Sequence, residues 1–401
     1  MTPPPPTAVI EALRETLAHD KHLESMLEES LAIARRRAER HLDPALYEAL
    51  DWPVDLPSYE AYLREFVRWI PQQSGAKAWR EKSAHDRQAQ EVSDRIAHYF
   101  WLVGQNVSDG TTSIVENSGP FREWLTEFAR QWGSFLDTPA SFNQQILDSF
   151  LADAPEYTIG ESLVDGRPNA PSGWLTFNQF FARELNGGLR PIADPGSNLT
   201  ITSAADCSFQ HLYGIDGESN IPDTTVKKTD SYGNVRQLLD GSRHADAFAG
   251  GTFVHYMLPP SAYHRFHLPV GGSVDEAFVI GGEVVMKVDL ADHQFVSSDT
   301  TTTGYEFSQT RGVVTIDTAG DAAGDIGVVA VVPVGMSQVA SVVLTATGER
   351  HMAKGEEFGY FQFGGSDMII LFQAGVDVEL DTDPGPRKVG SVLGRIRTTA
   401  P

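Results

Sequence analysis

Apolar residues in the first 150 positions recur at the spacing of an amphipathic helix. The stripes that keep this period lie at residues 10–17, 23–31, 59–70, 92–103 and 121–135, and the third of them ends before Pro71. Aromatic residues are frequent in these stripes, and apolar side chains that share one helix face typically pack into a core. The pattern therefore predicts a helical N-terminal domain over residues 1–150.

In the second half of the chain the pattern changes to β-branched runs separated by Gly, Asp and Thr turns. Strands are predicted at residues 279–288, 312–316, 326–333 and 339–344, then as a strand pair at 368–380 and a short strand at Val392. Residues 155–200 are rich in Gly, Pro and Asn and predict a connector with one helical patch at 177–181. The expected fold class is α+β, a helical N-terminal domain followed by a mostly β domain over residues 151–401.

The charge of the chain limits its partners. With 54 acidic and 31 basic residues the net charge is −23, which disfavours binding to nucleic acid and to anionic membranes. No apolar run approaches the roughly 20 residues of a membrane-spanning helix, and residues 1–6 lack the features of a secretory signal. We therefore expect a soluble protein with no nucleic-acid partner and no stable membrane attachment.

A single cysteine, Cys207, excludes an intramolecular disulfide and fits a reducing, cytoplasmic location. It also excludes a thiolate zinc site within one chain. A metal site formed by His264, His267 and Asp206 is conceivable, but no further His or Cys has the expected spacing. We therefore predict no metal.

The dipeptide Gly365-Ser366 is a candidate for self-cleavage. A serine hydroxyl that attacks the preceding carbonyl forms an ester, and elimination then breaks the chain and leaves dehydroalanine, which hydrolyses to a pyruvoyl group. The attack requires a flexible residue before the serine, which glycine provides, and a base that takes the hydroxyl proton. Taken alone, however, the sequence Gly-Gly-Ser is more simply explained as a turn between strands.

Two of the twelve histidines, His264 and His267, form a compact Tyr-His-Arg-x-His-x-Pro motif. In an extended segment, residues three apart point to opposite faces, so the two rings need not share a role. One could serve as a base in the precursor while the other acts on substrate. The alternative for either histidine is a hydrogen-bonded core residue or an exposed surface residue.

Over roughly half its length the chain resembles the phosphatidylserine decarboxylase family. The resemblance lies in five blocks that follow the family's order, at residues 174–192, 203–207, 263–269, 334–341 and 354–372. Two positions depart from the family pattern. Cys207 stands where a glycine is common, and Gly364-Gly365-Ser366-Asp367 stands where the membrane enzymes carry Leu-Gly-Ser-Thr. The Gly-Gly-Ser motif and residues 91–105 are similar to a soluble branch that includes fungal tryptophan decarboxylase.

The resemblance implies that Ser366 is the nucleophile and becomes the pyruvoyl cofactor, with cleavage after Gly365 into α and β chains that stay together. Asp206 and His267 resemble the remaining members of a triad that activates Ser366, and His264 resembles the histidine linked to decarboxylation. The substrate amine would condense with the pyruvoyl carbonyl, which accepts the electrons left by CO₂, so no pyridoxal phosphate is expected.

Three functions remain open at this point. The first is a pyruvoyl-dependent carboxy-lyase that acts on a small-molecule amino acid, aromatic and tryptophan first, because a ring is a source of binding energy for a free amino acid. The second is phosphatidylserine decarboxylation. The third is a non-processing relative that only binds a ligand, which the number of chains in the purified protein would distinguish from the first.

Overall fold

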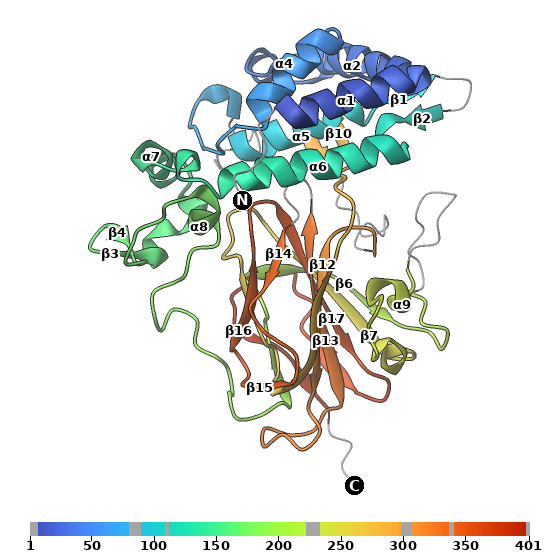
Figure 1. The fold of residues 1–401 in the computed structure, drawn as a ribbon. Coiled ribbons are helices and arrows are strands. Elements are labelled where there is room, and N and C mark those ends of the chain that lie inside the picture. Colours follow the sequence, from blue (N-terminus) through green and yellow to red (C-terminus); the bar gives the residue numbers. More distant parts are fainter. Residues whose placement is uncertain are drawn as a thin grey trace.

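The computed structural model describes residues 7–79, 90–108, 112–221, 233–297, 307–336 and 341–397. A layer of helices built from the N-terminal part lies across one end of a large antiparallel sheet built from the C-terminal part (Figure 1). The predicted α+β fold class is therefore confirmed.

The helices of the described residues are α1 (Thr7–His19), α2 (Lys21–His41), α3 (Pro44–Glu48), α4 (Leu56–Phe66), α5 (Glu91–Val103), α6 (Gly119–Leu136), α7 (Gln144–Asp153), α8 (Phe177–Phe181) and α9 (Val235–Leu238). The five predicted apolar stripes lie in or overlap α1, α2, α4, α5 and α6, whereas α3, α7 and α9 were not predicted. The stripe at 59–70 extends past the end of α4, because Val67 caps that helix and Pro71 disfavours helical backbone at residue 70.

Eight strands form the main sheet in the order β15-β9-β12-β13-β17-β7-β6-β19. Their bounds are β6 (Cys207–Gly214), β7 (Thr252–Leu258), β9 (Gly272–Ile280), β12 (Arg311–Asp317), β13 (Val328–Met336), β15 (Arg350–Met352), β17 (Gly365–Phe372) and β19 (Pro386–Arg387). Each of these neighbouring pairs is antiparallel. The strand β17 lies in the middle of the sheet, between β13 and β7.

Smaller sheets flank the main one. A three-stranded sheet has the order β14-β16-β8 and a second has the order β18-β20-β5. The bounds of these strands are β5 (Thr200–Thr202), β8 (Arg265–His267), β14 (Val342–Leu344), β16 (Glu357–Phe361), β18 (Val378–Leu380) and β20 (Val392–Ile396). Hairpins are formed by β1 (Asn106–Ser108) with β2 (Thr112–Ile114), by β3 (Leu163–Val164) with β4 (Arg167–Pro168), and by β10 (Val288–Ala291) with β11 (Gln294–Ser297).

Some predicted strands differ from the structure. The strand predicted at 279–288 is wrong, because β9 ends at Ile280 and a Cβ at Gly282 would lie 2.2 Å from the carbonyl carbon of Gln309. That close approach of two backbones requires glycine and ends the ladder. The run 368–380 contains β17 and β18, which belong to different sheets and do not pair. In the run 339–344, residues 339 and 340 lie outside the described residues and β14 begins at Val342.

The central strand β17 is buried on both faces. Met368 and Ile370 face a cluster that extends into the helical layer, whereas Ile369 and Leu371 face a second cluster that includes Val235 of α9. Since side chains alternate along a strand, Ser366 shares the face of Met368 and points toward the larger cluster. The fold therefore places this serine in the interior rather than in a surface turn.

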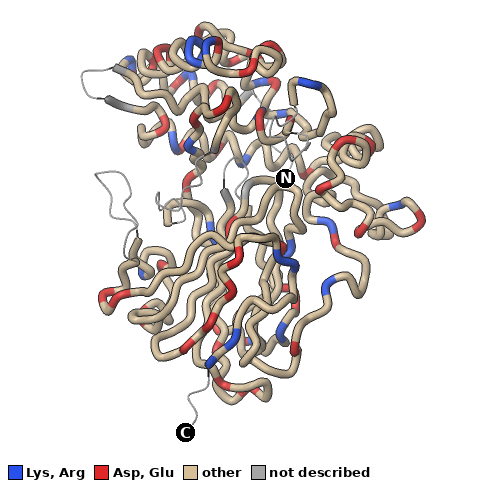
Figure 2. Tube along the Cα trace, turned by 180° about the vertical axis from the view of Figure 1, so that it is seen from behind, with Lys and Arg blue, Asp and Glu red and all other residues tan. Residues whose placement is uncertain are grey.

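The helical layer and the sheet are joined by apolar contacts as well as by the chain. The β10–β11 hairpin reaches α5, where the rings of Phe295 and Trp101 lie 6.0 Å apart between centroids. Acidic residues are present on both the helical and the β part (Figure 2). Among the helices of the described ranges, none combines the length and the apolar character that crossing a membrane requires.

Candidate active site

Ser366 lies near the start of β17, where it pairs with Gly335 of β13 and Leu258 of β7. Its side chain is 1% exposed, and its hydroxyl has no hydrogen-bond partner among the described residues. A buried hydroxyl without a partner costs about 1–3 kcal/mol, so its place in the fold calls for an explanation. Gly364, two residues earlier, has a φ of +156°, a backbone conformation that favours glycine.

His264 is fully buried, and its ring stacks on Phe181 with centroids 3.9 Å apart. The ring lies close to the backbone of Ala262, but the described residues offer its nitrogens no well-aligned hydrogen bond. Burial, assisted by the positive charge of Arg183, holds the pKa of His264 well below its usual value. The ring is therefore neutral at physiological pH, with one nitrogen protonated and the other able to accept a proton.

His267 is less buried than His264, and its ring is fully engaged. Nδ1 donates to the carbonyl of Gly355 at 2.9 Å, and Nε2 accepts from the hydroxyl of Tyr263 at 3.1 Å. The carbonyl only accepts, so it assigns the proton to Nδ1. Burial lowers the pKa of His267 and outweighs the opposing effect of the Gly355 carbonyl.

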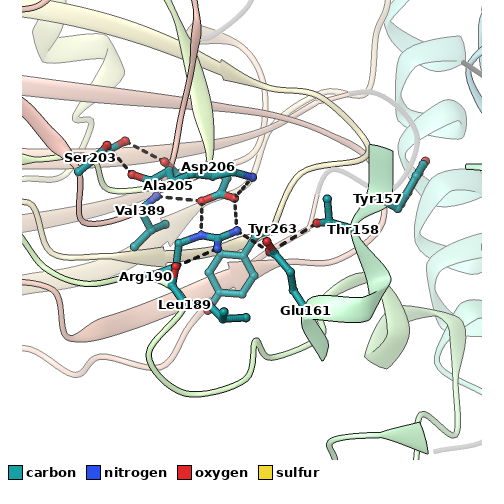
Figure 3. Close-up of polar contacts among 12 residues, drawn as sticks. Tyr157, Thr158, Glu161, Leu189, Arg190, Ser203, Ala205, Asp206, Tyr263 and Val389 are labelled. Atoms are coloured by element: carbon teal, nitrogen blue, oxygen red, sulfur yellow. Dashed lines mark hydrogen bonds and ion pairs between the residues drawn. The ribbon is translucent and has the colours of Figure 1, made fainter. Parts of the chain in front are cut away.

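Asp206 is a buried carboxylate surrounded by donors (Figure 3). Arg190 binds it in a bidentate manner, with Nε to Oδ1 at 3.0 Å and Nη2 to Oδ2 at 2.7 Å. Lys388 donates to Oδ2 at 2.9 Å and the backbone of Val389 to Oδ1 at 2.8 Å. Burial alone would raise the pKa of Asp206, but the hydrogen bonds from Arg190, Val389 and Lys388 hold it below its usual range.

Within the described residues, no hydrogen bond connects Asp206, His267 and Ser366 to one another. Asp206 and His267 do lie in neighbouring segments, since the backbone N–H of His267 donates to the carbonyl of Ala204 at 2.8 Å. Asp206 directly precedes β6, whereas Ser366 is on β17, and β7 lies between these two strands in the main sheet. The triad roles of these residues therefore remain predictions.

A different His–carboxylate pair flanks the candidate nucleophile. His255 of β7 and Asp367 of β17 approach to 3.0 Å, with side chains 2% and 0% exposed. Asp367 directly follows Ser366 and points to the opposite face of the sheet. Sequence reasoning did not single out His255, although it interrupts the otherwise apolar run 253–258, which is typical of a buried strand.

No group of three His, Cys, Asp or Glu side chains that could hold a metal ion occurs in the ranges the structure describes. His264 and His267, which the metal interpretation would place together, differ in burial and partners. Their surroundings are those of two separate side chains rather than a shared ligand set.

Gly355→Ala is expected to destabilise the protein and to displace the carbonyl that holds His267. Gly355 has a φ of +81°, and a Cβ there would lie 2.4 Å from Ile192. Strained backbone of this kind costs about 1–3 kcal/mol, and the contact adds to it. Gly166→Ala is the matched control, because its φ is +75° with nothing within 4 Å of the added Cβ. Urea unfolding midpoints measure both losses, and equal losses would show that the Ile192 contact contributes nothing.

Comparison with known proteins places these residues in a family context. Residues 177–395 match the phosphatidylserine decarboxylase family. The chain is 30% identical over 256 residues to a phosphatidylserine decarboxylase proenzyme of Clostridium perfringens, which covers 64% of this chain and 78% of that protein. It is 27% identical over 298 residues to the decarboxylase iboD of Amanita muscaria, with 66% and 81% covered.

A third relative is much longer than this chain. Phosphatidylserine decarboxylase proenzyme 2 of rice is 32% identical over 208 residues, which are 52% of this chain and only 31% of the rice protein. The family match nevertheless covers more than half of the present chain and includes the segments that carry Asp206, His264 and Ser366. The chain therefore belongs to the phosphatidylserine decarboxylase family.

Proposed function

We propose that this protein is a pyruvoyl-dependent decarboxylase of a soluble aromatic L-amino acid, with tryptophan the first candidate, and that it matures by cleavage between Gly365 and Ser366. The observation that carries the proposal is the buried, unpartnered hydroxyl of Ser366 directly after two glycines, in a family-matched segment. A turn serine would be solvated, whereas this hydroxyl has been removed from water without a compensating hydrogen bond.

Self-cleavage needs only residues of this chain and water. The Ser366 oxygen bonds to the carbonyl carbon of Gly365, the peptide C–N bond breaks, and an ester with a free amine results. Loss of the Cα proton of residue 366 then expels the Gly365 carboxylate and leaves dehydroalanine. Water releases ammonia and completes the pyruvoyl group at the start of the new α chain. Pairing with β13 and β7 holds the reacting residue in place throughout.

The site fits such a group at residue 366. A pyruvoyl carbonyl supplies an electron acceptor for the pair left when CO₂ departs. The surroundings are dry, which favours loss of a carboxylate charge. His264 is buried and neutral near neutral pH, so it could act as a proton donor only after it takes up a proton against its lowered pKa.

Two features support an amino-acid substrate. The relative iboD is named simply a decarboxylase, and the match extends over 81% of its length. The Gly-Gly-Ser motif and residues 91–105 resemble the soluble branch of the family. The second candidate function, decarboxylation of phosphatidylserine, is favoured by the names of the rice and Clostridium relatives.

A substrate panel tests the proposal. The purified protein is offered the twenty amino acids, and phosphatidylserine in detergent, and CO₂ and amine products are measured with Ser366→Ala as the blank. An aromatic amino acid, tryptophan first, is expected to react best. Activity on phosphatidylserine with none on a free aromatic amino acid would refute the proposed substrate and establish the second candidate.

A further inference from the structure

Beyond Ser366, strand β17 carries a single polar residue, Asp367, followed by the apolar run Met-Ile-Ile-Leu-Phe at residues 368–372. The side chain of Asp367 is fully buried. It lies on the face of β17 that also carries Ile369 and Leu371, which is opposite to the face of Ser366. A carboxylate in such surroundings needs a specific partner, because burying an unpaired charge is costly.

His255 of the neighbouring strand β7 supplies such a partner (Figure 1). Its Nε2 lies 3.0 Å from Oδ2 of Asp367, and its side chain is 2% exposed. The ladder places Asp367 opposite Met257 and His255 opposite Ile369, so the contact runs diagonally between the two strands. The contact therefore depends on the present register of β17 against β7.

The apolar part of β17 specifies this register only weakly. Residues 368–371 alternate between two apolar clusters, and contacts between apolar side chains have no fixed direction. A slip of two residues along β7 would keep every side chain on its own face. The same slip would move residue 366 by about 7 Å. It would also separate Asp367 from His255, so this pair opposes the slip.

Cleavage after Gly365 would remove another constraint on the strand. In the uncut chain, Gly365 pairs with Met336 and continues β17, so the polypeptide holds residue 366 from both sides. In the cut chain, residue 366 is a chain end, and chain ends open more readily than strand interiors. The pyruvoyl group has no backbone N–H, so Asp367 is the first residue of the α chain that keeps this donor for the ladder.

We propose that His255 and Asp367 are positioning residues, which fix the register of β17 after cleavage and thereby hold the pyruvoyl group in place. The inference rests on the self-cleavage in the proposed function and is independent of the substrate. A buried polar pair in an otherwise apolar interface can select one register at some cost in stability. Both side chains lie on the face opposite to Ser366, so they act through the backbone of β17 rather than on the reacting atoms.

The test follows the pyruvoyl methyl group by nuclear magnetic resonance. Serine labelled with ¹³C at Cβ is incorporated into the full-length chain. In the mature protein the Cβ of residue 366 is a methyl carbon, whereas every other serine keeps a CH₂ group that bears its hydroxyl. The wild type is expected to give one methyl signal, because the pair holds the group in one place. This measurement requires no substrate and no turnover.

The main variant replaces both members of the pair, His255→Leu together with Asp367→Leu. Apolar residues in place of a buried ion pair often preserve stability, while the preference for one register is lost. In the uncut Ser366→Ala chain the two substitutions should therefore leave the urea midpoint unchanged. In the cut protein, the intensity of the main methyl signal relative to all others is expected to fall about tenfold. Should the double variant be unstable, Asp367→Leu alone leaves no carboxylate at this position and carries the same expectation.

Leu371→Ala is the matched control. Leu371 is fully buried on the same face of β17 but farther from the new chain end. Its truncation should lower stability and leave a single methyl signal. An unchanged signal in the double variant would overturn the inference, and so would equal splitting in Leu371→Ala. Loss of cleavage in the double variant would also overturn it, since the pair would then act before the cut. A wild type without a methyl signal would contradict self-cleavage itself, and the register role with it.

Discussion

Ser366→Ala is expected to remain a single uncut chain and to show no decarboxylation. Without the hydroxyl nothing attacks the Gly365 carbonyl, so neither the ester nor the pyruvoyl group forms. The wild type should instead give two chains, residues 1–365 and 366–401, the second blocked at its N-terminus. Intact-mass measurement distinguishes the two states directly, and activity should fall to the background of the assay.

Ser162→Ala is the matched control for that experiment. Ser162 is also fully buried, and its hydroxyl likewise has no partner among the described residues, but it lies outside the processing segment. Normal cleavage and activity are expected of it. A fully active wild type that runs as one chain of full length would contradict the self-cleavage mechanism, and so would a cut Ser366→Ala chain.

Asp206→Asn is expected to destabilise the protein as well as slow its cleavage. The side chain of Arg190 is 10% exposed and forms a bidentate pair with Asp206. Breaking a buried pair from one side costs about 3–5 kcal/mol. Glu161, which also binds Arg190 at 2.8 Å, should hold the loss near the lower end of that range. Urea unfolding of the uncut Ser366→Ala chain, with and without Asp206→Asn, isolates this loss from any effect of cleavage.

Lys388→Met is the control for the charge network. Lys388 is 55% exposed, so its pair with Asp206 is screened by solvent and its loss should cost about 1 kcal/mol or less. If Asp206 acted only in the triad, Asp206→Asn would lose cleavage while its free energy of unfolding stayed unchanged. Unchanged stability of Asp206→Asn would therefore contradict the structural role that the Arg190 contacts indicate.

Elements with a strong local pattern could be predicted from the sequence. The stripes at 10–17, 23–31 and 121–135 lie in helices, and the patch at 177–181 is α8, because one buried face is enough to fix a helix. The strand predicted at 279–288 failed for a tertiary reason. Its apolar pattern continues through Gly281 and Gly282, but the close approach of the Gln309 backbone ends the ladder there.

The candidate site also combines residues that a local sequence pattern indicates with residues that only the fold brings together. Ser366 and His264 could be proposed from the sequence because each belongs to a compact motif. The cations that bind Asp206 come from positions 190 and 388, and no local pattern links two segments so far apart. The sequence also could not show that Nε and Nη1 of Arg183 lack hydrogen-bond partners among the described residues, because that depends on which segments fold around the side chain.

The position of β17 within the sheet has a consequence for the cut protein. The segment after residue 365 carries β17, β18, β19 and β20, and three of these strands pair with strands from before the cut. The mature enzyme would thus resemble a split protein reassembled by strand complementation. Its two pieces would be held by backbone ladders rather than by a covalent link. Once fully denatured, the short piece must find the long one by diffusion, so refolding would change from a unimolecular to a bimolecular process.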